Sequence, residues 1–301
     1  MRNKSQPMSE NNEIPRRSAL KTMASSAALA ATSGIAVKAA HHESKGSLKG
    51  NIHHSVCKWC YRNQTLEEVC QKAKNIGIEA IDLLGVEDYP TVKKYGLTCS
   101  TTKGVPGGIK GGLNRLENHD AIVEFFEYTL PLAKNGGSPN VICFSGNREG
   151  MGEEQGLENC AIGLKRIAPV AERHGVTVIM EQLNSKRNHP DYMCDNTPWG
   201  VELCDRVGSE RFKLLYDIYH MQIMEGDVID TIKEFHTYYG HYHTGGVPGR
   251  HEIDDTQELY YPAIMRAIVE TGYKGYVAQE FIPASDDPLN SLELAVKICD
   301  V

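Results

Sequence analysis

The sequence lacks the features that define several large classes of protein. Its 41% hydrophobic and 24% charged residues are those of an ordinary globular chain, and no repeat, collagen-like or disordered class fits it. No glycine-rich phosphate turn follows the first apolar run, which argues against a doubly wound nucleotide-binding sheet. The glycine-rich stretch KGVPGGIKGG at 103–112 lacks the Gly-Lys-Ser/Thr ending of a phosphate-binding loop. That stretch is therefore either a lid or a plain flexible connection.

Positive charge is scarce outside the N-terminus. The net charge of the 301 residues is −7, yet the first 39 residues carry six basic and two acidic side chains, so the remainder of the chain stands at −11. An acidic surface repels a phosphate backbone, so no nucleic-acid partner is expected.

The cysteines form no recognisable disulfide or zinc framework. There are nine, an odd number without the spacing of a small disulfide-rich scaffold, and no second CxxC completes a zinc tetrad with CKWC at 57–60. We interpret most of them as buried thiols and 57–60 as the end of a strand, with a redox or metal site as the alternative.

The N-terminal segment resembles an export signal. PRRSALK at 15–21 is similar to the twin-arginine motif, and it precedes the Ala-rich, weakly hydrophobic MASSAALAATSGIAV and then VKAA. We predict a signal peptide and linker over 1–40, cleaved near Ala39 or Ala40, and a mature protein in the periplasm or cell envelope. The segment is too short and too weakly apolar for an ordinary membrane helix, so no stable membrane span is expected after cleavage. A disordered basic tail is the alternative.

From residue 51 to residue 301 the chain alternates short apolar runs with amphipathic stretches. This alternation predicts an α/β fold, a single-domain (β/α)8 TIM barrel, since eight units in about 250 residues match that barrel in number and size. The expected strands are 52–58, 78–84, 97–102, 139–145, 176–181, 212–218, 238–244 and 275–281. Helices are expected at 65–76, 119–135, 155–174 and 260–271, with kinks or breaks at Pro131 and Pro169.

The last four expected strands end in side chains that bind metals. They deliver Glu181, Asp217, His243 and Glu280, and the carboxyl ends of barrel strands meet at one mouth. A single strand-end acid is explained as well by a helix cap or an ion pair. Four in succession favour a divalent cation, and three carboxylates with one imidazole favour Mg²⁺ or Mn²⁺ over zinc.

Longer motifs then resemble a known family. They are EQLNSKRNHPDY (181–192), YDIYHMQIMEGD (216–227), GGVPGRHE (245–252) with ELYY (258–261), and GYKGYVAQEFIP (272–283). Together they are similar to the hydroxypyruvate isomerases of the xylose-isomerase-like TIM-barrel superfamily. The seventh strand departs from this pattern, because HYHTGG stands where those isomerases usually place a glutamine ligand. That feature is closer to the ketose 3-epimerases, so the resemblance leaves the substrate open.

The resemblance implies roles for particular residues. Glu181, Asp217, His243 and Glu280 match the metal ligands of the family, and Glu181 and Glu280 also match its pair of catalytic acids and bases. On chemical grounds, a metal on the substrate oxygens and two opposed carboxylates suit a reaction that moves a carbonyl to the neighbouring carbon.

Three further residues are substrate-binding candidates. His220 and Arg250 match positions that contact substrate in related ketose epimerases, and the planar guanidinium of Arg250 suits a substrate carboxylate. Lys186 follows Glu181 closely and can attract an anion, although a solvated turn explains it equally well. The alternatives are a solvent-facing histidine at a helix start for His220 and a surface loop arginine for Arg250. His241 is expected to support the metal ligands from behind.

These observations predict a metal-dependent enzyme that interconverts hydroxypyruvate and tartronate semialdehyde. A ketose 3-epimerase or another sugar isomerase with the same metal site is the nearest alternative. A non-catalytic periplasmic protein that binds sugar acids is the alternative from another class. The expected partner is a small sugar or hydroxy-keto acid, and the oligomeric state stays open, a homo-oligomer included.

Overall fold

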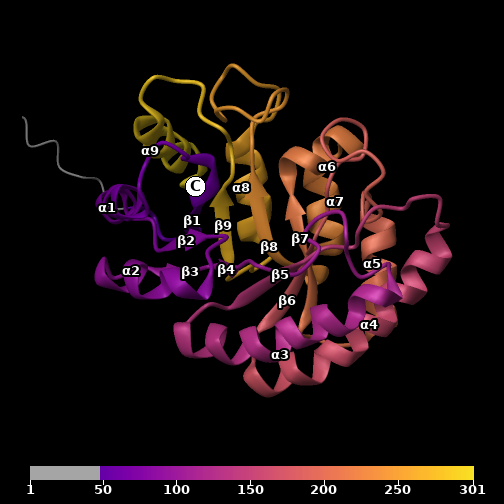
Figure 1. The fold of residues 1–301 in the computed structure, drawn as a ribbon. Helices are drawn as coiled ribbons and strands as arrows, with labels where there is room; N and C mark the ends of the chain where they lie inside the picture. The colour runs from indigo at the N-terminus through magenta and orange to yellow at the C-terminus, as the bar shows by residue number, and fades with distance from the viewer. Residues whose placement is uncertain (1–47) are drawn as a thin grey trace, which may run out of the picture. The chain divides into compact units, whose positions relative to one another are not determined.

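The computed structural model describes residues 48–301, which form a barrel of parallel strands surrounded by helices (Figure 1). The predicted export segment and its cleavage site lie outside the described residues. The strands are β1 (His53–Cys57), β2 (Ala80–Asp82), β3 (Thr98–Cys99), β4 (Thr101–Thr102), β5 (Asn140–Cys143), β6 (Thr177–Glu181), β7 (Phe212–Asp217), β8 (Tyr239–Thr244) and β9 (Tyr276–Gln279).

All eight predicted strands are present, and the third one is divided. Its halves, β3 and β4, are separated by Ser100 and stand at the two ends of the hydrogen-bonded strand order. β3 pairs with β2, β4 pairs with β5, and a parallel bridge joins Leu84 to Thr102. The divided strand thereby closes the sheet into a barrel, and the predicted (β/α)8 architecture is confirmed.

The helices surround the strands, as Figure 1 shows. They are α1 (Leu66–Ile76), α2 (Tyr89–Lys94), α3 (His119–Gly136), α4 (Glu153–His174), α5 (Thr197–Val207), α6 (Ile218–Met224), α7 (Val228–Phe235), α8 (Tyr261–Glu270) and α9 (Pro288–Cys299), with short 3-10 turns at Lys58–Cys60, Val86–Asp88, Leu116–Asn118 and His236–Tyr238. The expected breaks at Pro131 and Pro169 are wrong, because α3 and α4 each continue through their proline as one helix, whereas the kinks stay a prediction. None of the helices within 48–301 combines the length and apolar character that crossing a membrane would require.

Local sequence signals set the ends of these helices. Thr65 and Glu68 form a capping box at the start of α1, in which each side chain accepts a hydrogen bond from the other residue's backbone N–H. Gly77 ends the same helix at φ 86°, a left-handed conformation that a glycine adopts without a Cβ penalty.

Side chains inside the barrel form layers, because every second residue of a strand points inward. Ile142, Ile179 and Leu215 pack together as a small apolar cluster within the barrel. Residues two apart on a strand point to the same side, so Glu181 and Asp217 lie on the inward face one step beyond Ile179 and Leu215. An apolar floor therefore lies beneath the acidic residues at the barrel mouth.

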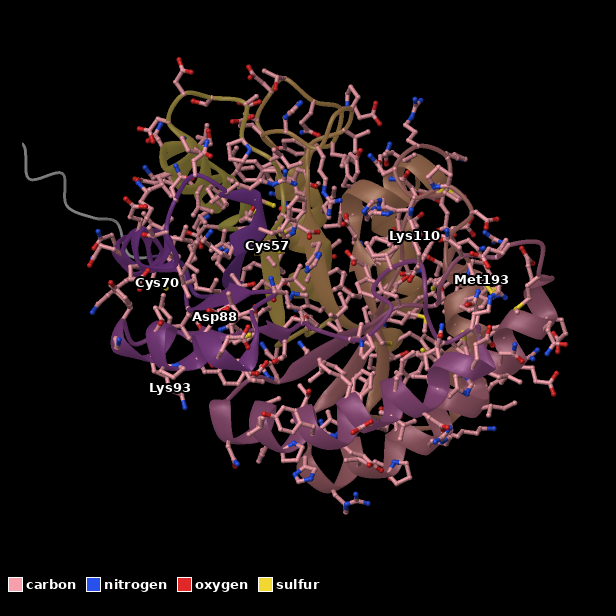
Figure 2. The ribbon with its side chains drawn as sticks, viewed as in Figure 1. Cys57, Cys70, Asp88, Lys93, Lys110 and Met193 are labelled. Atoms are coloured by element: carbon pink, nitrogen blue, oxygen red, sulfur yellow. The ribbon has the colours of Figure 1, made fainter. Side chains whose placement is uncertain are left out.

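All nine cysteines are buried and none is in a disulfide, which confirms the interpretation as buried thiols. Figure 2 labels Cys57 and Cys70, both inaccessible to solvent, and Lys93 of α2, which is exposed. Burial raises the pKa of the Cys57 and Cys60 thiols well above the ordinary value. CKWC therefore does not have the thiolate character of a redox motif.

Candidate metal and active site

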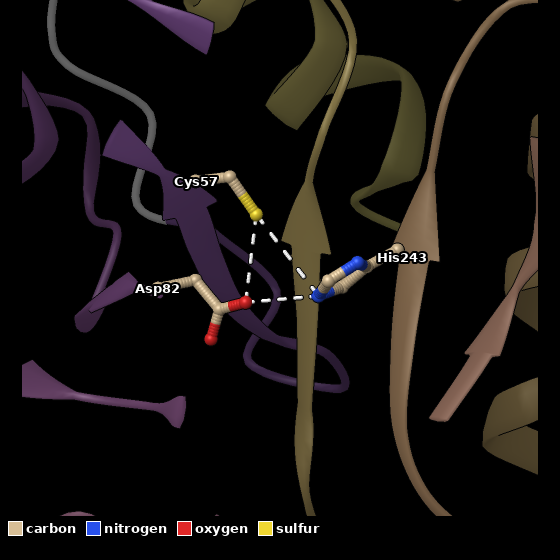
Figure 3. A group of neighbouring side chains, drawn as sticks. All are labelled: Cys57, Asp82 and His243. Atoms are coloured by element: carbon tan, nitrogen blue, oxygen red, sulfur yellow. Dashed lines mark hydrogen bonds and ion pairs between the residues drawn. The ribbon is translucent and has the colours of Figure 1, made fainter. Parts of the chain in front are cut away.

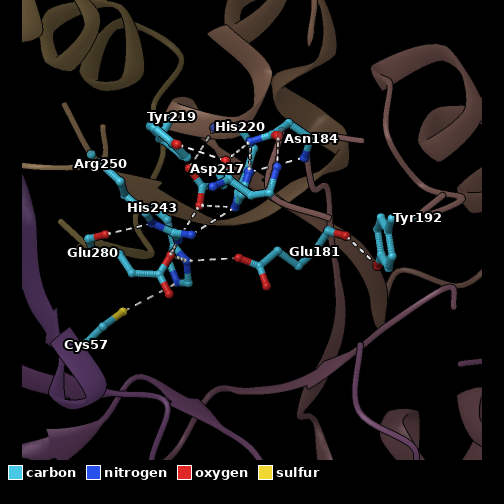
Figure 4. A network of polar contacts seen from close by, with 12 residues as sticks. Cys57, Glu181, Asn184, Tyr192, Asp217, Tyr219, His220, His243, Arg250 and Glu280 are labelled. Carbon is cyan, nitrogen blue, oxygen red and sulfur yellow. Dashed lines mark hydrogen bonds and ion pairs between the residues drawn. The ribbon is translucent and has the colours of Figure 1, made fainter. Parts of the chain in front are cut away.

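The four predicted ligands converge at the barrel mouth (Figure 4). Glu181 and Asp217 are the last residues of β6 and β7, His243 is the penultimate residue of β8, and Glu280 follows β9. One ligand atom from each lies within 4.8 Å of the others, and all four residues are buried. Three carboxylates this close and this dry need positive charge among them.

Asp217 has a separate oxygen for each of the roles that its sequence position allows, a helix cap and a metal ligand. Its Oδ1 accepts a hydrogen bond from the backbone N–H of His220 at 3.2 Å, which caps α6. Its Oδ2 lies 3.0 Å from Arg250 Nη2 and faces the centre of the site. The helix cap is thus compatible with metal ligation, because each role uses a different oxygen.

The ring of His243 is placed as a metal ligand would be. Its Nδ1 lies 2.6 Å from Glu280 Oε2 and 3.4 Å from Glu181 Oε1, yet this buried nitrogen has no partner with hydrogen-bond geometry. A buried imidazole nitrogen between two carboxylate oxygens is the environment that a divalent cation would complete. The donor set of three carboxylates and one imidazole therefore fits a divalent metal ion.

The three carboxyl groups of the site differ in pKa. Burial raises the pKa of Glu181, and it raises the pKa of Asp217 to about 7 against the opposing charge of Arg250. Burial also opposes the ionisation of Glu280, but Arg250 and His243 together hold its pKa well below the usual range. Such a spread among neighbouring carboxylates is typical of sites that exchange protons.

Arg250 neutralises part of this acidic cluster. Besides the contact with Asp217, its Nη2 donates to Glu280 Oε2, and its Nε donates to the backbone carbonyl of Glu280 at 3.2 Å. The guanidinium lies 5.4 Å from the ring of Trp59 and 5.2 Å from the ring of Tyr219. The expectation of a surface loop arginine is wrong, since the side chain is only 11% exposed.

His220 is completely buried, so the solvent-facing alternative is wrong as well. The backbone N–H of Asn184 donates to its Nδ1 at 3.1 Å, and burial holds the pKa of the ring well below its usual value. The other ring nitrogen, Nε2, lies 3.5 Å from Asp217 Oδ2 and 3.1 Å from Arg250 Nη1. His220 does not line the cavity described below, so a contact with substrate stays a prediction.

Lys186 does not reach the site. Its Nζ donates to the backbone carbonyls of Ile223 at 3.1 Å and Met224 at 2.8 Å, at the end of α6. An ammonium group is favourable there because the free carbonyls of a helix C-terminus carry partial negative charge. The structure thus gives Lys186 a role as a helix cap, away from the predicted substrate.

A cavity of about 520 Å³ opens over the site. Its polar end is formed by Glu181, His189, Arg250 and Glu280, and its wall by the apolar residues Leu83, Val105, Ile109, Ile142, Phe144 and Leu183. The stretch 103–112 supplies two of these wall residues, Val105 and Ile109, and so covers one side of the cavity. Glu181 and Glu280 therefore face a space that a substrate can enter, whereas Asp217 and His243 are not exposed to it.

Two residues at the site were not found from the sequence. Trp59 donates its indole N–H to Glu280 Oε1 at 2.7 Å, and Asp82, the last residue of β2, lies 2.9 Å from His243 Nε2. Asp82 obeys the same strand-end rule as the other acids, so its signal was present in IEAIDLL. His241, predicted to support the ligands, also contacts Asp82, at 3.3 Å.

The comparisons with known proteins agree with this architecture. The family described as xylose isomerase-like TIM barrel matches residues 70–297. The chain belongs to that family. A relative named 2-oxo-tetronate isomerase, from Cupriavidus necator, is 38% identical over 127 residues, 42% of this chain and 46% of the relative. The putative hydroxypyruvate isomerase of Homo sapiens is 28% identical over 176 residues, 55% and 62% of the two chains.

A solved structure in the same fold extends the comparison over most of the chain. It is described as an AP endonuclease, family 2, from Brucella melitensis, is 25% identical, and superposes with a TM-score of 0.72 over 81% of this chain and 97% of the other. The matches to the two curated relatives span only about half to three fifths of their lengths. The relatives therefore support an isomerase of the family, and the particular reaction is argued from the site.

Proposed function

We propose that this protein is a divalent-metal-dependent isomerase of small hydroxy-keto acids, with hydroxypyruvate and tartronate semialdehyde as the first substrate pair to test. The observation that carries the proposal is the pair Glu181 and Glu280. Both are buried, both line the cavity, and both lie against the same His243 nitrogen. Binding a sugar acid would not need two carboxylates at the reacting end of the cavity.

The proposed reaction moves a carbonyl to the neighbouring carbon without net oxidation. One carboxylate removes the proton from the hydroxyl-bearing carbon next to the carbonyl, and the resulting enediolate is protonated on the former carbonyl carbon. The hydroxyl proton moves in the same direction, from the oxygen of the first carbon to the former carbonyl oxygen, so all atoms are conserved. A bound divalent ion would supply stabilisation of the negative charge that develops on the substrate oxygens.

The chain's own residues would prepare this step. Trp59 holds Glu280 Oε1, which leaves Oε2 directed at the centre of the site. Burial raises the pKa of Glu181 and so moves it toward the working pH, which favours proton transfer by this residue. Arg250 would hold the substrate carboxylate once a metal ion takes over the charge of Asp217 and Glu280.

A sugar substrate is the second candidate, and two observations favour it. His243 lies on β8, the strand whose sequence is closer to the ketose 3-epimerases. The cavity of about 520 Å³ is also large for a three-carbon acid, because one water occupies about 30 Å³ of the liquid. A four-carbon keto acid or a ketose would fill more of it.

A substrate panel tests these alternatives. Metal-loaded protein is incubated with hydroxypyruvate, a 2-oxo-tetronate and several ketohexoses, and products are followed by NMR. Turnover of a keto acid supports the proposal, whereas turnover of ketoses alone replaces it by the epimerase. If Glu181→Gln and Glu280→Gln match the wild type on every substrate that reacts, the catalytic assignment fails. A protein that binds sugar acids but converts none supports the non-catalytic alternative.

The proposed location is the periplasm or cell envelope, after export by the twin-arginine-type segment. PRRSALK and the Ala-rich stretch after it support this proposal. N-terminal sequencing of the protein from the envelope fraction tests it, with a mature end near Ala39 or Ala40 expected. An intact N-terminus on envelope protein would contradict it.

A further inference from the structure

Behind the four ligands, Asp82 is surrounded by hydrogen-bond donors from several other strands. Its Oδ2 lies 2.9 Å from His243 Nε2, 3.3 Å from His241 Nε2 and 3.4 Å from the Cys57 thiol, and Ser100 Oγ donates to Oδ1. Figure 3 shows the contacts with Cys57 and His243. The residue is inaccessible to solvent, so these groups replace the water that a carboxylate would otherwise bind.

The contact with Asp82 decides which nitrogen of His243 carries the proton. A carboxylate oxygen only accepts hydrogen bonds, and Asp82 has hydrogen-bond geometry with Nε2, whereas Glu181 and Glu280 have none with Nδ1, so the ring donates a proton from Nε2. Nδ1 lies between Glu181 and Glu280, so a neutral ring with its proton on Nε2 would offer the Nδ1 lone pair to a metal ion held there. The opposite tautomer would place a lone pair against Asp82 and a proton where the metal ion is expected.

We propose that Asp82 is a positioning residue that fixes the tautomer and orientation of His243, so that Nδ1 is presented to the metal ion. The inference rests on the proposed metal site and adds a residue that the four ligands do not include. Carboxylates behind a ligating histidine also make the imidazole more basic, and their loss typically costs about 10- to 100-fold in metal affinity or activity.

A second metal ion is the competing explanation for this cluster. Ligand atoms of Cys57, Asp82 and His243 also lie within 4.8 Å of one another. However, Asp82 accepts from the thiol and from the imidazole N–H, so the three groups already satisfy one another. A closed structural zinc site would also need a fourth protein ligand. Hydrogen bonding accounts for the geometry without a second ion.

The test uses Asp82→Asn with Asp88→Asn as a matched control. Asp88, labelled in Figure 2, is six residues further along the chain, and its side chain makes no capping hydrogen bond. Metal-free protein is titrated with Mn²⁺ alone in a calorimeter. We expect one ion per chain in all three proteins, a dissociation constant raised about 10- to 100-fold in Asp82→Asn, and no change in Asp88→Asn. The rise in Tm produced by Mn²⁺ should shrink in Asp82→Asn only.

The outcomes separate this inference from the metal site itself. If the wild type binds no Mn²⁺, the metal site fails, and Asp82 loses its role with it. If the wild type binds one ion and a folded Asp82→Asn binds it equally well, only the positioning role fails. Two ions in the wild type and one in Asp82→Asn would make Asp82 a ligand instead. Should Asp82→Asn not fold, the ¹⁵N shifts of the His243 ring in the Mg²⁺-loaded wild type decide, since a proton on Nδ1 in that form overturns the proposal.

Discussion

Replacing Arg250 by methionine should destabilise the metal-free protein far more than the metal-bound protein. The guanidinium is the nearest fixed positive charge to both Asp217 and Glu280, which are 0% and 3% exposed. Removing one partner of a buried ion pair typically costs about 3–5 kcal/mol, because the other charge is left without compensation. Methionine keeps most of the apolar contact with Trp59 and Tyr219, so the charge is the main loss.

The expected loss of stability in Arg250→Met follows from this range of energies. Partial protonation of Asp217, whose pKa is about 7, relieves some of the repulsion, so we take the lower end, about 3 kcal/mol at pH 8. For a domain of this size that corresponds to a fall in Tm of about 6–12 °C. Below pH 7 the carboxyl groups left without Arg250 take up protons in the variant. The difference in Tm between Arg250→Met and the wild type should therefore narrow as the pH falls.

Thermal unfolding followed by circular dichroism, with EDTA and with saturating Mn²⁺, measures this effect. A bound ion replaces the lost charge, so Mn²⁺ should raise the Tm of Arg250→Met by several degrees more than that of the wild type. Arg62→Met is the matched control, since Arg62 also lies over Trp59, at 5.8 Å, but is exposed. Equal Tm values for Arg250→Met and the wild type in EDTA would refute the reasoning.

Three further predictions concern the site. Glu181→Gln and Glu280→Gln keep the side-chain size but cannot exchange a proton, so each should lower kcat by about 10²- to 10⁴-fold. Activity assays on the metal-loaded variants check this, and unchanged kcat in both would remove the acid–base assignment. Burial raises the pKa of Glu181 and brings that of Asp217 to about 7, so protons should compete with the metal below neutrality. Mn²⁺ affinity should then fall about tenfold per pH unit for each displaced proton, and a flat profile on the acid side would contradict this. Lys186→Met should leave KM unchanged and lower the free energy of unfolding by about 0.3–1 kcal/mol, because the ammonium caps α6. A large rise in KM would instead indicate that Lys186 binds the substrate.

The sequence was sufficient for the parts of the site that depend on strand order alone. Glu181, Asp217, His243 and Glu280 each follow an apolar run, and the barrel brings all strand ends to one mouth, so their convergence needs no knowledge of loops. Asp82 obeys the same rule on β2. It was missed because the expected strand ran on to residue 84, which placed Asp82 inside the strand, whereas β2 ends at Asp82.

Residues on the loops were harder to place. Arg250 was expected at the substrate, and the structure shows its guanidinium paired with Asp217 and Glu280. Lys186 is only five residues beyond Glu181, but its chain turns toward the end of α6. Loop directions follow from tertiary packing and charge balance, which a one-dimensional pattern does not contain. The same limit applies to Pro131 and Pro169, where helix packing holds α3 and α4 intact.

The central claim is that Glu181, Asp217, His243 and Glu280 hold one divalent ion that the isomerase needs. The most direct measurement is a calorimetric titration of the metal-free protein with Mn²⁺, beside Asp217→Asn, followed by assay of the same samples on the substrate panel. The account predicts one ion per chain, turnover only in the loaded wild type, and an affinity at least about 100-fold weaker in Asp217→Asn. Equal binding by the two proteins, or full turnover by the metal-free wild type, would contradict it.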